Sequence, residues 1–125
     1  MSINIENEEK TEIRIIVAFE DEYYAYQGTL AAAIKILRPD AVVETAEPEK
    51  LKDVAKRFGP DLIIGNPFSK ADLDSVPAWI QLSLDPAHST KVNVDGEYSE
   101  MLNPTLDKLL VIIEQVEQFT RTSDP

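Results

Sequence analysis

The segment Pro60-Asp61-Leu62-Ile63-Ile64-Gly65-Asn66-Pro67 decides the fold of this chain. Its centre is apolar without interruption, which is typical of a strand that is buried on both faces of a parallel sheet. One polar side chain, Asn66, follows at the carboxyl end of the predicted strand. The segment Ile13-Arg14-Ile15-Ile16-Val17-Ala18-Phe19 has the same character and is followed by an acidic stretch, Glu20 to Glu22. These two segments therefore predict parallel strands with polar groups at one edge of the sheet.

Helical and extended segments alternate between these two strands. Apolar residues at intervals of three and four predict a helix over residues 22–38, which ends before a proline. Residues 41–45 form a short predicted strand, and residues 48–59 form a second helix that begins with Pro48 and ends at Gly59. This β-α-β-α-β order predicts right-handed crossovers and a parallel core with strand order 2-1-3.

The second half of the chain departs from this alternation. Six residues separate the predicted strand 79–84 from the next one, 91–95, whereas a parallel crossover needs about a dozen. We therefore predict an antiparallel hairpin at the edge of the sheet. Asp95-Gly96 is a favoured turn dipeptide, after which residues 97–99 can return as one more short strand. A final helix is expected over residues 104–119.

Apolar and polar residues alternate strictly in the two late strands. Such alternation marks strands with one wet face, so we expect reduced helical cover on one face of the sheet. The predicted fold is a three-layer, doubly wound α/β domain over residues 13–119. Residues 1–12 are expected to be a disordered acidic segment, and residues 120–125 a flexible tail.

Composition narrows the classes of function. The 125 residues suffice for one domain. The absence of cysteine and the presence of a single histidine, His88, exclude disulfides, thiolate metal sites and multi-histidine metal sites. A net charge of −11 argues against nucleic acid as a partner. No segment has the character of a membrane span, and residues 1–12 are too polar for a signal peptide, so a cytoplasmic location and no membrane partner are expected.

No catalytic constellation can be assembled from the sequence. His88 lies in a predicted surface turn, and no Gly-x-Ser-x-Gly motif accompanies it. Without a nucleophile paired with a base, enzymatic activity is not expected.

In layout and at several positions, the chain resembles the receiver domains of response regulators, which have a flavodoxin-like fold. The resemblance covers residues 13–65 and the final helix. Glu20 and Asp21 match the acidic pair that holds Mg²⁺ in that family, and Asn66 matches the phosphoacceptor aspartate. Ser83 lies near the family's conserved hydroxyl position. An amide cannot be phosphorylated like a carboxylate, so the resemblance implies a pseudo-receiver with a signalling role.

The chain also departs from the receiver pattern. The lysine that follows the fifth strand in the family has no counterpart at Asp95-Gly96, the fourth helix is missing and the third is reduced. An uncharacterised family that shares only the doubly wound layout is the alternative.

A candidate ligand site lies at the carboxyl ends of the parallel strands, where open α/β sheets bind ligands. Glu20, Asp21 and Asn66 should converge there, and their oxygens suit a hard cation such as Mg²⁺. The alternative is that Asp21 caps the first helix and Glu20 is simply solvated. Lys91, at the start of an antiparallel strand, should reach the same edge, either as a ligand-binding cation or as a solvated edge lysine. No cofactor is favoured.

Other residues suggest protein contacts. Trp79 and Gln81 lie on the face without helical cover, where a loop or a partner must bury the indole. The remaining candidates point away from the predicted core or widen the apolar stripe of the last helix: Tyr24, Val111, Ile112 and Phe119. A core position is the alternative for the helix residues. The leading hypothesis is a non-catalytic signalling or protein-interaction module that forms a homodimer, and the alternative is a small-ligand or Mg²⁺-binding switch.

Overall fold

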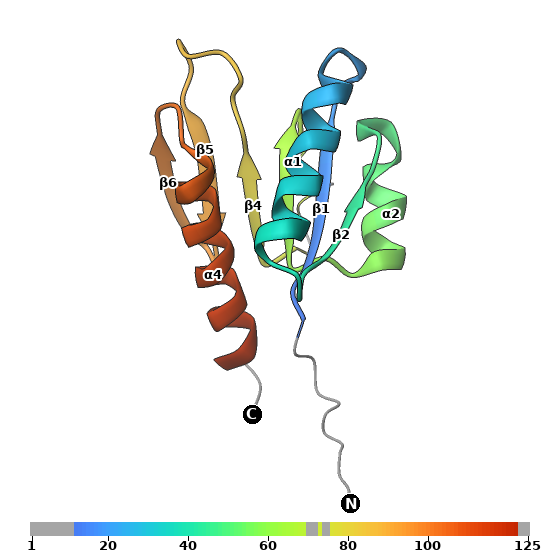
Figure 1. The fold of residues 1–125 in the computed structure, drawn as a ribbon, viewed down its shortest axis with the longest axis vertical. Helices are drawn as coiled ribbons and strands as arrows, with labels where there is room; N and C mark the ends of the chain where they lie inside the picture. Colours follow the sequence, from blue (N-terminus) through green and yellow to red (C-terminus); the bar gives the residue numbers. More distant parts are fainter. Residues whose placement is uncertain (1–11, 70–72, 74–75, 123–125) are drawn as a thin grey trace, which may run out of the picture.

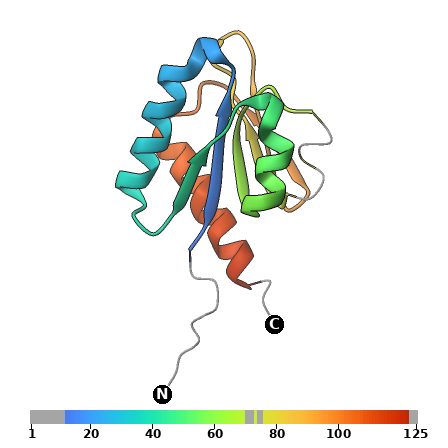
Figure 2. The same ribbon diagram turned by 90° about the vertical axis from the view of Figure 1, so that its right-hand side faces the viewer.

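The structure is a computed structural model that describes residues 12–69, 73 and 76–122. A six-stranded mixed sheet forms the middle layer, with helices on both faces (Figures 1 and 2). Its strands are β1 (Arg14–Phe19), β2 (Val42–Thr45), β3 (Leu62–Asn66), β4 (Ala78–Gln81), β5 (Thr90–Val94) and β6 (Glu97–Met101). The helices are the 3-10 turns η2 (Asp21–Tyr23) and η3 (Pro48–Lys50) and the α-helices α1 (Tyr24–Leu37), α2 (Leu51–Phe58) and α4 (Leu106–Thr122).

The strand order is β2-β1-β3-β4-β5-β6. The first four strands are parallel, and β5 and β6 are each antiparallel to their predecessor. The predicted α/β class, the parallel 2-1-3 core and the antiparallel edge are therefore confirmed. The turn between β5 and β6 consists of Asp95 and Gly96, both with positive φ (53° and 84°), which suits a right-twisted two-residue hairpin.

Helices α1 and α4 cover one face of the sheet (Figure 1). Alternate residues of the strands face these helices, as in Ile15 and Val17 of β1, and pack against Ile34 of α1 and Ile113 of α4, all of which are fully buried. Glu117 of α4 is also buried and forms an ion pair with Arg38, just after α1. This face therefore holds the larger part of the core.

Helix α2 packs on the opposite face, where Leu51 and Phe58 contact the cluster that includes Ile16 and Ile63 of β1 and β3. Gly59 ends α2 with a positive φ of 66°. No helix among the elements named above lies over β4, β5 and β6 on this face (Figure 2). The predicted reduction of helical cover on one face is thus present.

Several predicted boundaries differ from those observed. Strand β4 ends at Gln81 rather than at residue 84, because the Ser83 N–H donates to the side-chain hydroxyl of Thr90 (3.0 Å) instead of a backbone carbonyl of β5. The last helix covers residues 106–122, so part of the segment predicted as a tail is helical. Residues 1–11 of the predicted disordered segment and the end of the tail, residues 123–125, lie outside the described residues.

Strands β1 and β3 approach each other unusually closely. Ala18 and Gly65 are register partners, and a Cβ atom on Gly65 would lie 1.8 Å from the Ala18 carbonyl oxygen. Only glycine fits that position. The peptide bond between Asn66 and Pro67, at the end of β3, is cis.

Candidate functional site

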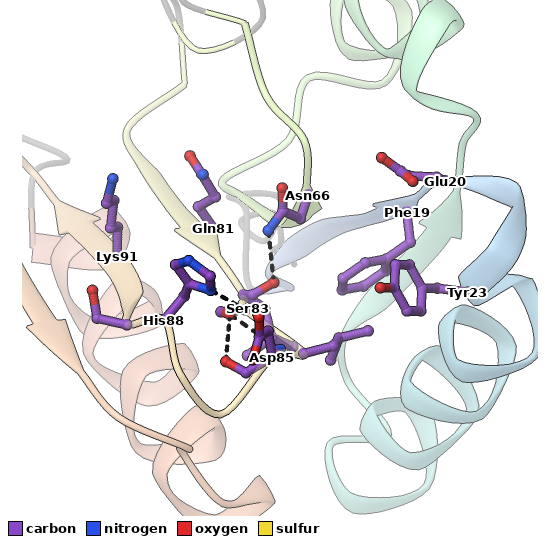
Figure 3. Close-up of a pocket in the computed structure, with 12 residues that line it drawn as sticks. Phe19, Glu20, Tyr23, Asn66, Gln81, Ser83, Asp85, His88 and Lys91 are labelled. Atoms are coloured by element: carbon purple, nitrogen blue, oxygen red, sulfur yellow. Dashed lines mark hydrogen bonds and ion pairs between the residues drawn. The ribbon is translucent and has the colours of Figure 1, made fainter.

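A pocket of about 440 Å³ opens at the carboxyl rim of the sheet (Figure 3). It lies where β1, β3 and β4 end and where the antiparallel strand β5 begins. Helix α1, which follows β1, covers one face of the sheet, and helix α2, which precedes β3, covers the other face. The chain therefore changes face between the neighbouring strands β1 and β3. Ligands of open α/β sheets bind in the crevice at such a point. The lining residues come from β1 and the turn after it (Phe19, Glu20, Tyr23), from β3 (Asn66), from β4 and the segment after it (Gln81, Leu82, Ser83, Leu84, Asp85) and from the chain that enters β5 (His88, Ser89, Lys91).

The amide of Asn66 has a defined orientation. Its Nδ2 donates to the carbonyl oxygen of Leu82 at 3.1 Å. Because a carbonyl can only accept, the amide must turn its nitrogen toward Leu82. The Oδ1 atom therefore remains as a hydrogen-bond acceptor on the wall of the pocket (Figure 3).

Gln81 and Lys91 lie side by side on one face, as register partners in β4 and β5. Within the described ranges, neither side chain forms a hydrogen bond, and no carboxylate lies within ion-pair distance of Lys91. The nearest acid in register is Glu100 of β6. Its pKa is lowered mainly by hydrogen bonds from the Tyr98 and Ser89 hydroxyls, with a smaller contribution from the charge of Lys91.

Asp85 organises the loop between β4 and β5. Its Oδ1 accepts from the Ala87 N–H, and its Oδ2 lies 2.9 Å from His88 Nδ1. These contacts lower the pKa of Asp85, the Ala87 bond more than the His88 bond. An ionised carboxylate only accepts, so Nδ1 of His88 carries the proton and Nε2 is left to other contacts. Ser83 Oγ accepts from the Asp85 N–H and donates to the Asp85 carbonyl, which closes the turn.

The other wall of the pocket belongs to the turn after β1. The Phe19 N–H donates to the buried Gln27 Oε1 at 2.7 Å, which holds the end of β1 on helix α1. Glu20 follows as an exposed residue at the start of η2. The Glu22 carboxylate accepts a hydrogen bond from the Tyr23 hydroxyl and so raises the pKa of Tyr23, and the charges of Glu20 and Asp85 raise it further.

The structure brings together most of the residues predicted for the rim site. Glu20, Asn66, Ser83 and Lys91 line one pocket, together with Gln81, which was predicted as an interface residue. Asp21 does not line it and lies instead in an adjacent depression beside residues such as Glu22 and Glu49. Asp21 is also not a helix cap, since Glu20 is the N-cap residue of η2 and Tyr23 is that of α1.

This arrangement does not favour a metal centre. No group of three or more His, Asp or Glu side chains within the described ranges is positioned to hold a metal ion. Mg²⁺ needs close to octahedral oxygen ligands, and the separation of Asp21 from Asn66 removes one carboxylate from the predicted set.

The residues predicted for protein contacts fall into different environments. Trp79 is half-buried between Phe68 and Tyr98, with ring centroids 6.3 and 6.5 Å away. Side chains of the same chain therefore cover part of the indole. Tyr24 is 73% exposed on α1, far from the sheet edge formed by β6. Phe119 is half-buried near the end of α4.

Val111 and Ile112 belong to a second feature, a groove of about 490 Å³ between α4 and the β5–β6 hairpin. Ile112 is buried in the core at 5% exposure and only borders the groove, whereas Val111 is 54% exposed. The remaining apolar walls are Val92, Val94 and Met101. Of Val111 and Ile112, only Val111 thus presents its side chain to solvent.

Sequence reasoning missed the pocket residues of the loop before β5, Asp85, His88 and Ser89, and also Phe19, Tyr23, Leu82 and Leu84. A signal for the loop residues was available: the antiparallel direction that brings Lys91 to the rim also brings the residues just before it. The hydrogen bonds within the loop depend on its turn geometry and cannot be deduced from residue spacing.

None of the helices in the described part of the chain combines the length and apolar character needed to cross a membrane. The chain matches no protein-family model, no curated protein and no solved structure.

Proposed function

We propose that this chain is a non-catalytic protein-interaction module that forms a homodimer by joining the β6 edges of two copies. One observation carries the proposal: an apolar groove lies beside a sheet edge that has no neighbouring strand among the described residues. An unpaired edge strand offers a row of backbone donors and acceptors to another strand. The groove adds apolar surface that such pairing would bury.

The sequence of β6 supports pairing with itself. In a two-fold antiparallel arrangement centred on Ser99, Glu97 faces Met101 of the second copy, and Tyr98 faces Glu100. Acidic side chains directly opposite each other would be destabilising, and this register avoids them. Tyr98 and Glu100 are compatible neighbours, since the Tyr98 hydroxyl donates to Glu100 Oε2 at 2.6 Å within one chain. Both copies use the same surface, as closed two-fold dimers require.

The groove supports the same arrangement. The two-fold axis would run perpendicular to the sheet, so that α4 of both copies would lie on the same face of a continuous sheet. Val111, which is exposed in the single chain, would then face the second copy instead of solvent. The groove also carries charges of both signs, Glu97 and Lys108, so its local charge does not repel an identical surface.

The resemblance to receiver domains supports a signalling role for such a module. Asn66 occupies the position that matches the phosphoacceptor aspartate, and an amide cannot take up a phosphoryl group as a carboxylate does. Association with a second copy, rather than phosphorylation, would then transmit the signal.

Sedimentation equilibrium over a range of protein concentrations tests the dimer. We expect a monomer–dimer equilibrium that Ser99→Glu weakens, because it places two acids opposite each other at the two-fold axis. Val111→Asp should weaken it as well, because it places a charge in the apolar groove.

Two matched variants serve as controls. Thr45→Glu adds the same charge to β2, the strand at the other edge of the sheet, and Ile36→Asp replaces a 75% exposed apolar residue on α1. Both should leave the equilibrium unchanged. A strict monomer at high concentration, or a dimer that only the control variants disrupt, would refute the β6 dimer.

A further inference from the structure

We infer that the pocket at the carboxyl rim binds a small zwitterion whose ammonium and carboxylate groups are separated by several bonds, such as an ω-amino acid. This inference goes beyond the proposed dimer, because the rim pocket and the α4 groove share no residue. It rests on the position of the two unpaired charges of the pocket and on the polar groups between them.

The two charges lie at opposite ends of the pocket. Lys91 stands on β5, and Glu20 follows β1, with β4 and β3 between them (Figure 3). The third charged group, Asp85, is already bonded to the Ala87 N–H and to His88. Within the described ranges, neither Lys91 nor Glu20 lies in an ion pair, although Glu100 is the register partner of Lys91. The pocket therefore has a cation at the Lys91 end and a carboxylate at the Glu20 end, and the carboxylate of Asp85 is held by its own loop.

The separation of these charges sets the length of the ligand. Three strand spacings lie between β5 and β1, which is about 14 Å between the backbones. The side chains of Lys91 and Glu20 shorten the gap but do not close it (Figure 3). In glycine the two charges are one carbon apart, so it can reach one end at a time. A longer chain between the charges lets one molecule contact both ends.

The two neutral amides between the charges, Gln81 and Asn66, can add hydrogen bonds to the same ligand groups. Near Lys91, the Gln81 amide has an N–H donor available for a carboxylate. Toward Glu20, the Asn66 amide presents its Oδ1 acceptor, because the bond to the Leu82 carbonyl fixes the side of its nitrogen. An acceptor beside a carboxylate suits an ammonium group, and a donor beside an ammonium suits a carboxylate.

The charge of the whole chain disfavours the simpler alternatives. A net charge of −11 repels phosphates and other polyanions at long range, and the acidic turn of Glu20 to Glu22 repels them at the pocket itself. A zwitterion has no net charge and escapes this repulsion.

A homologous series of ligands tests the inference. Amide chemical shifts are followed by NMR while glycine, γ-aminobutyrate or ε-aminocaproate is added to the full chain. We expect the affinity to rise along the series and ε-aminocaproate to shift the amides of Glu20 and Lys91 together. Hexanoate and hexylamine, which each carry one of the two charges, should bind more weakly.

Charge-removing variants complete the test. Lys91→Met and Glu20→Gln should each weaken ε-aminocaproate binding by about fivefold, the factor that corresponds to an exposed ion pair of about 1 kcal/mol. Lys52→Met on α2 and Glu44→Gln on β2 make the same changes elsewhere and should have no effect. The inference is overturned if glycine or hexanoate binds as tightly as ε-aminocaproate, if the Lys91 and Glu20 variants bind normally, or if no ligand of the series shifts the pocket amides at tens of millimolar.

Discussion

A methyl group on Gly65 would lie 1.8 Å from the carbonyl oxygen of Ala18, well inside any allowed contact. The obstacle is backbone in the middle of the parallel core, not the end of a flexible side chain. Relief would require β1 and β3 to move apart, and both strands carry fully buried residues on each face.

We therefore expect Gly65→Ala to lower the free energy of unfolding by about 3 kcal/mol. Gly28→Ala is the matched control, because a Cβ there meets no atom within 4 Å. Gly28 lies within α1, where alanine is favoured over glycine, so this change should stabilise the protein by about 0.5–1 kcal/mol. Urea unfolding measures both effects. A Gly65→Ala variant as stable as the parent would contradict the close approach of the strands.

Sequence reasoning recognised Gly65 as part of a buried strand but not as a position that excludes every other residue. The pattern of apolar residues predicts which strands are buried. It contains no information on the distance between two backbones, which depends on how the strands twist against each other. The same limit applies to Asn66, whose place at the rim was predicted but whose amide orientation depends on Leu82.

Among the elements, the loop between β4 and β5 has the most distinctive chemistry. The pKa of Asp85 is lowered below its ordinary value of 3.8 by the Ala87 N–H and by His88. At pH values above the ordinary pKa, the ionised carboxylate of Asp85 therefore stabilises the loop. This stabilising contribution is lost as the pH falls through the lowered pKa.

In His88→Ala, we expect the pKa of Asp85 to rise part of the way toward 3.8, because the stronger Ala87 hydrogen bond remains. Carboxyl carbon shifts recorded against pH measure it. Ser89→Ala is the control: it should leave Asp85 unchanged and raise the pKa of Glu100, which loses the hydrogen bond from the Ser89 hydroxyl. An unchanged Asp85 pKa in His88→Ala would show that the imidazole contact does not persist in solution.

The direction of this loop was predictable, whereas its internal structure was not. Six residues between the strands are too few for a parallel crossover, and that count predicted the reversal correctly. The end of β4 was placed too late because Leu82 and Leu84 continue the apolar alternation beyond the last paired residue. The bond from the Ser83 N–H to Thr90 Oγ1 overrides that pattern.

At the scale of the whole molecule, the net charge of −11 is the dominant property. Like charges spread over a small domain repel one another and favour the expanded, unfolded chain. Raising NaCl from about 0.01 M to about 0.15 M shortens the screening length from about 30 Å to about 8 Å.

We therefore expect the urea midpoint to rise over this range of NaCl and the proposed dimer, in which two acidic chains meet, to tighten over the same range. Both changes should level off at higher NaCl, whereas sodium sulfate should continue to stabilise through its exclusion from apolar surface. A midpoint that does not respond to NaCl would indicate that the acidic side chains are too far apart to repel one another.

The layers of the molecule follow from sequence patterns more reliably than its surfaces do. Uninterrupted apolar segments correctly identified β1 and β3 as the centre of the parallel core, and the short connection after β4 correctly predicted the antiparallel edge, although the alternating strand β4 is itself parallel to β3. The environments of Trp79 and Val111 were harder to predict, since Trp79 was compatible with cover by a loop or by a partner, and Val111 with a core or an interface position. Phe68 and Tyr98, which flank Trp79, come from other parts of the chain, and only the folded arrangement brings them together.

Strand β5 serves both faces of the sheet with consecutive residues: Lys91 lines the rim pocket, and Val92 lines the groove beneath α4. A ligand held by Lys91 therefore contacts the residue next to one that lines the groove. Thermodynamic reciprocity then requires that any effect of the pocket's occupant on dimer assembly be matched by an equal effect of assembly on the affinity of that occupant. The pleat of a single strand thus places two surfaces that have no residue in common on adjacent residues.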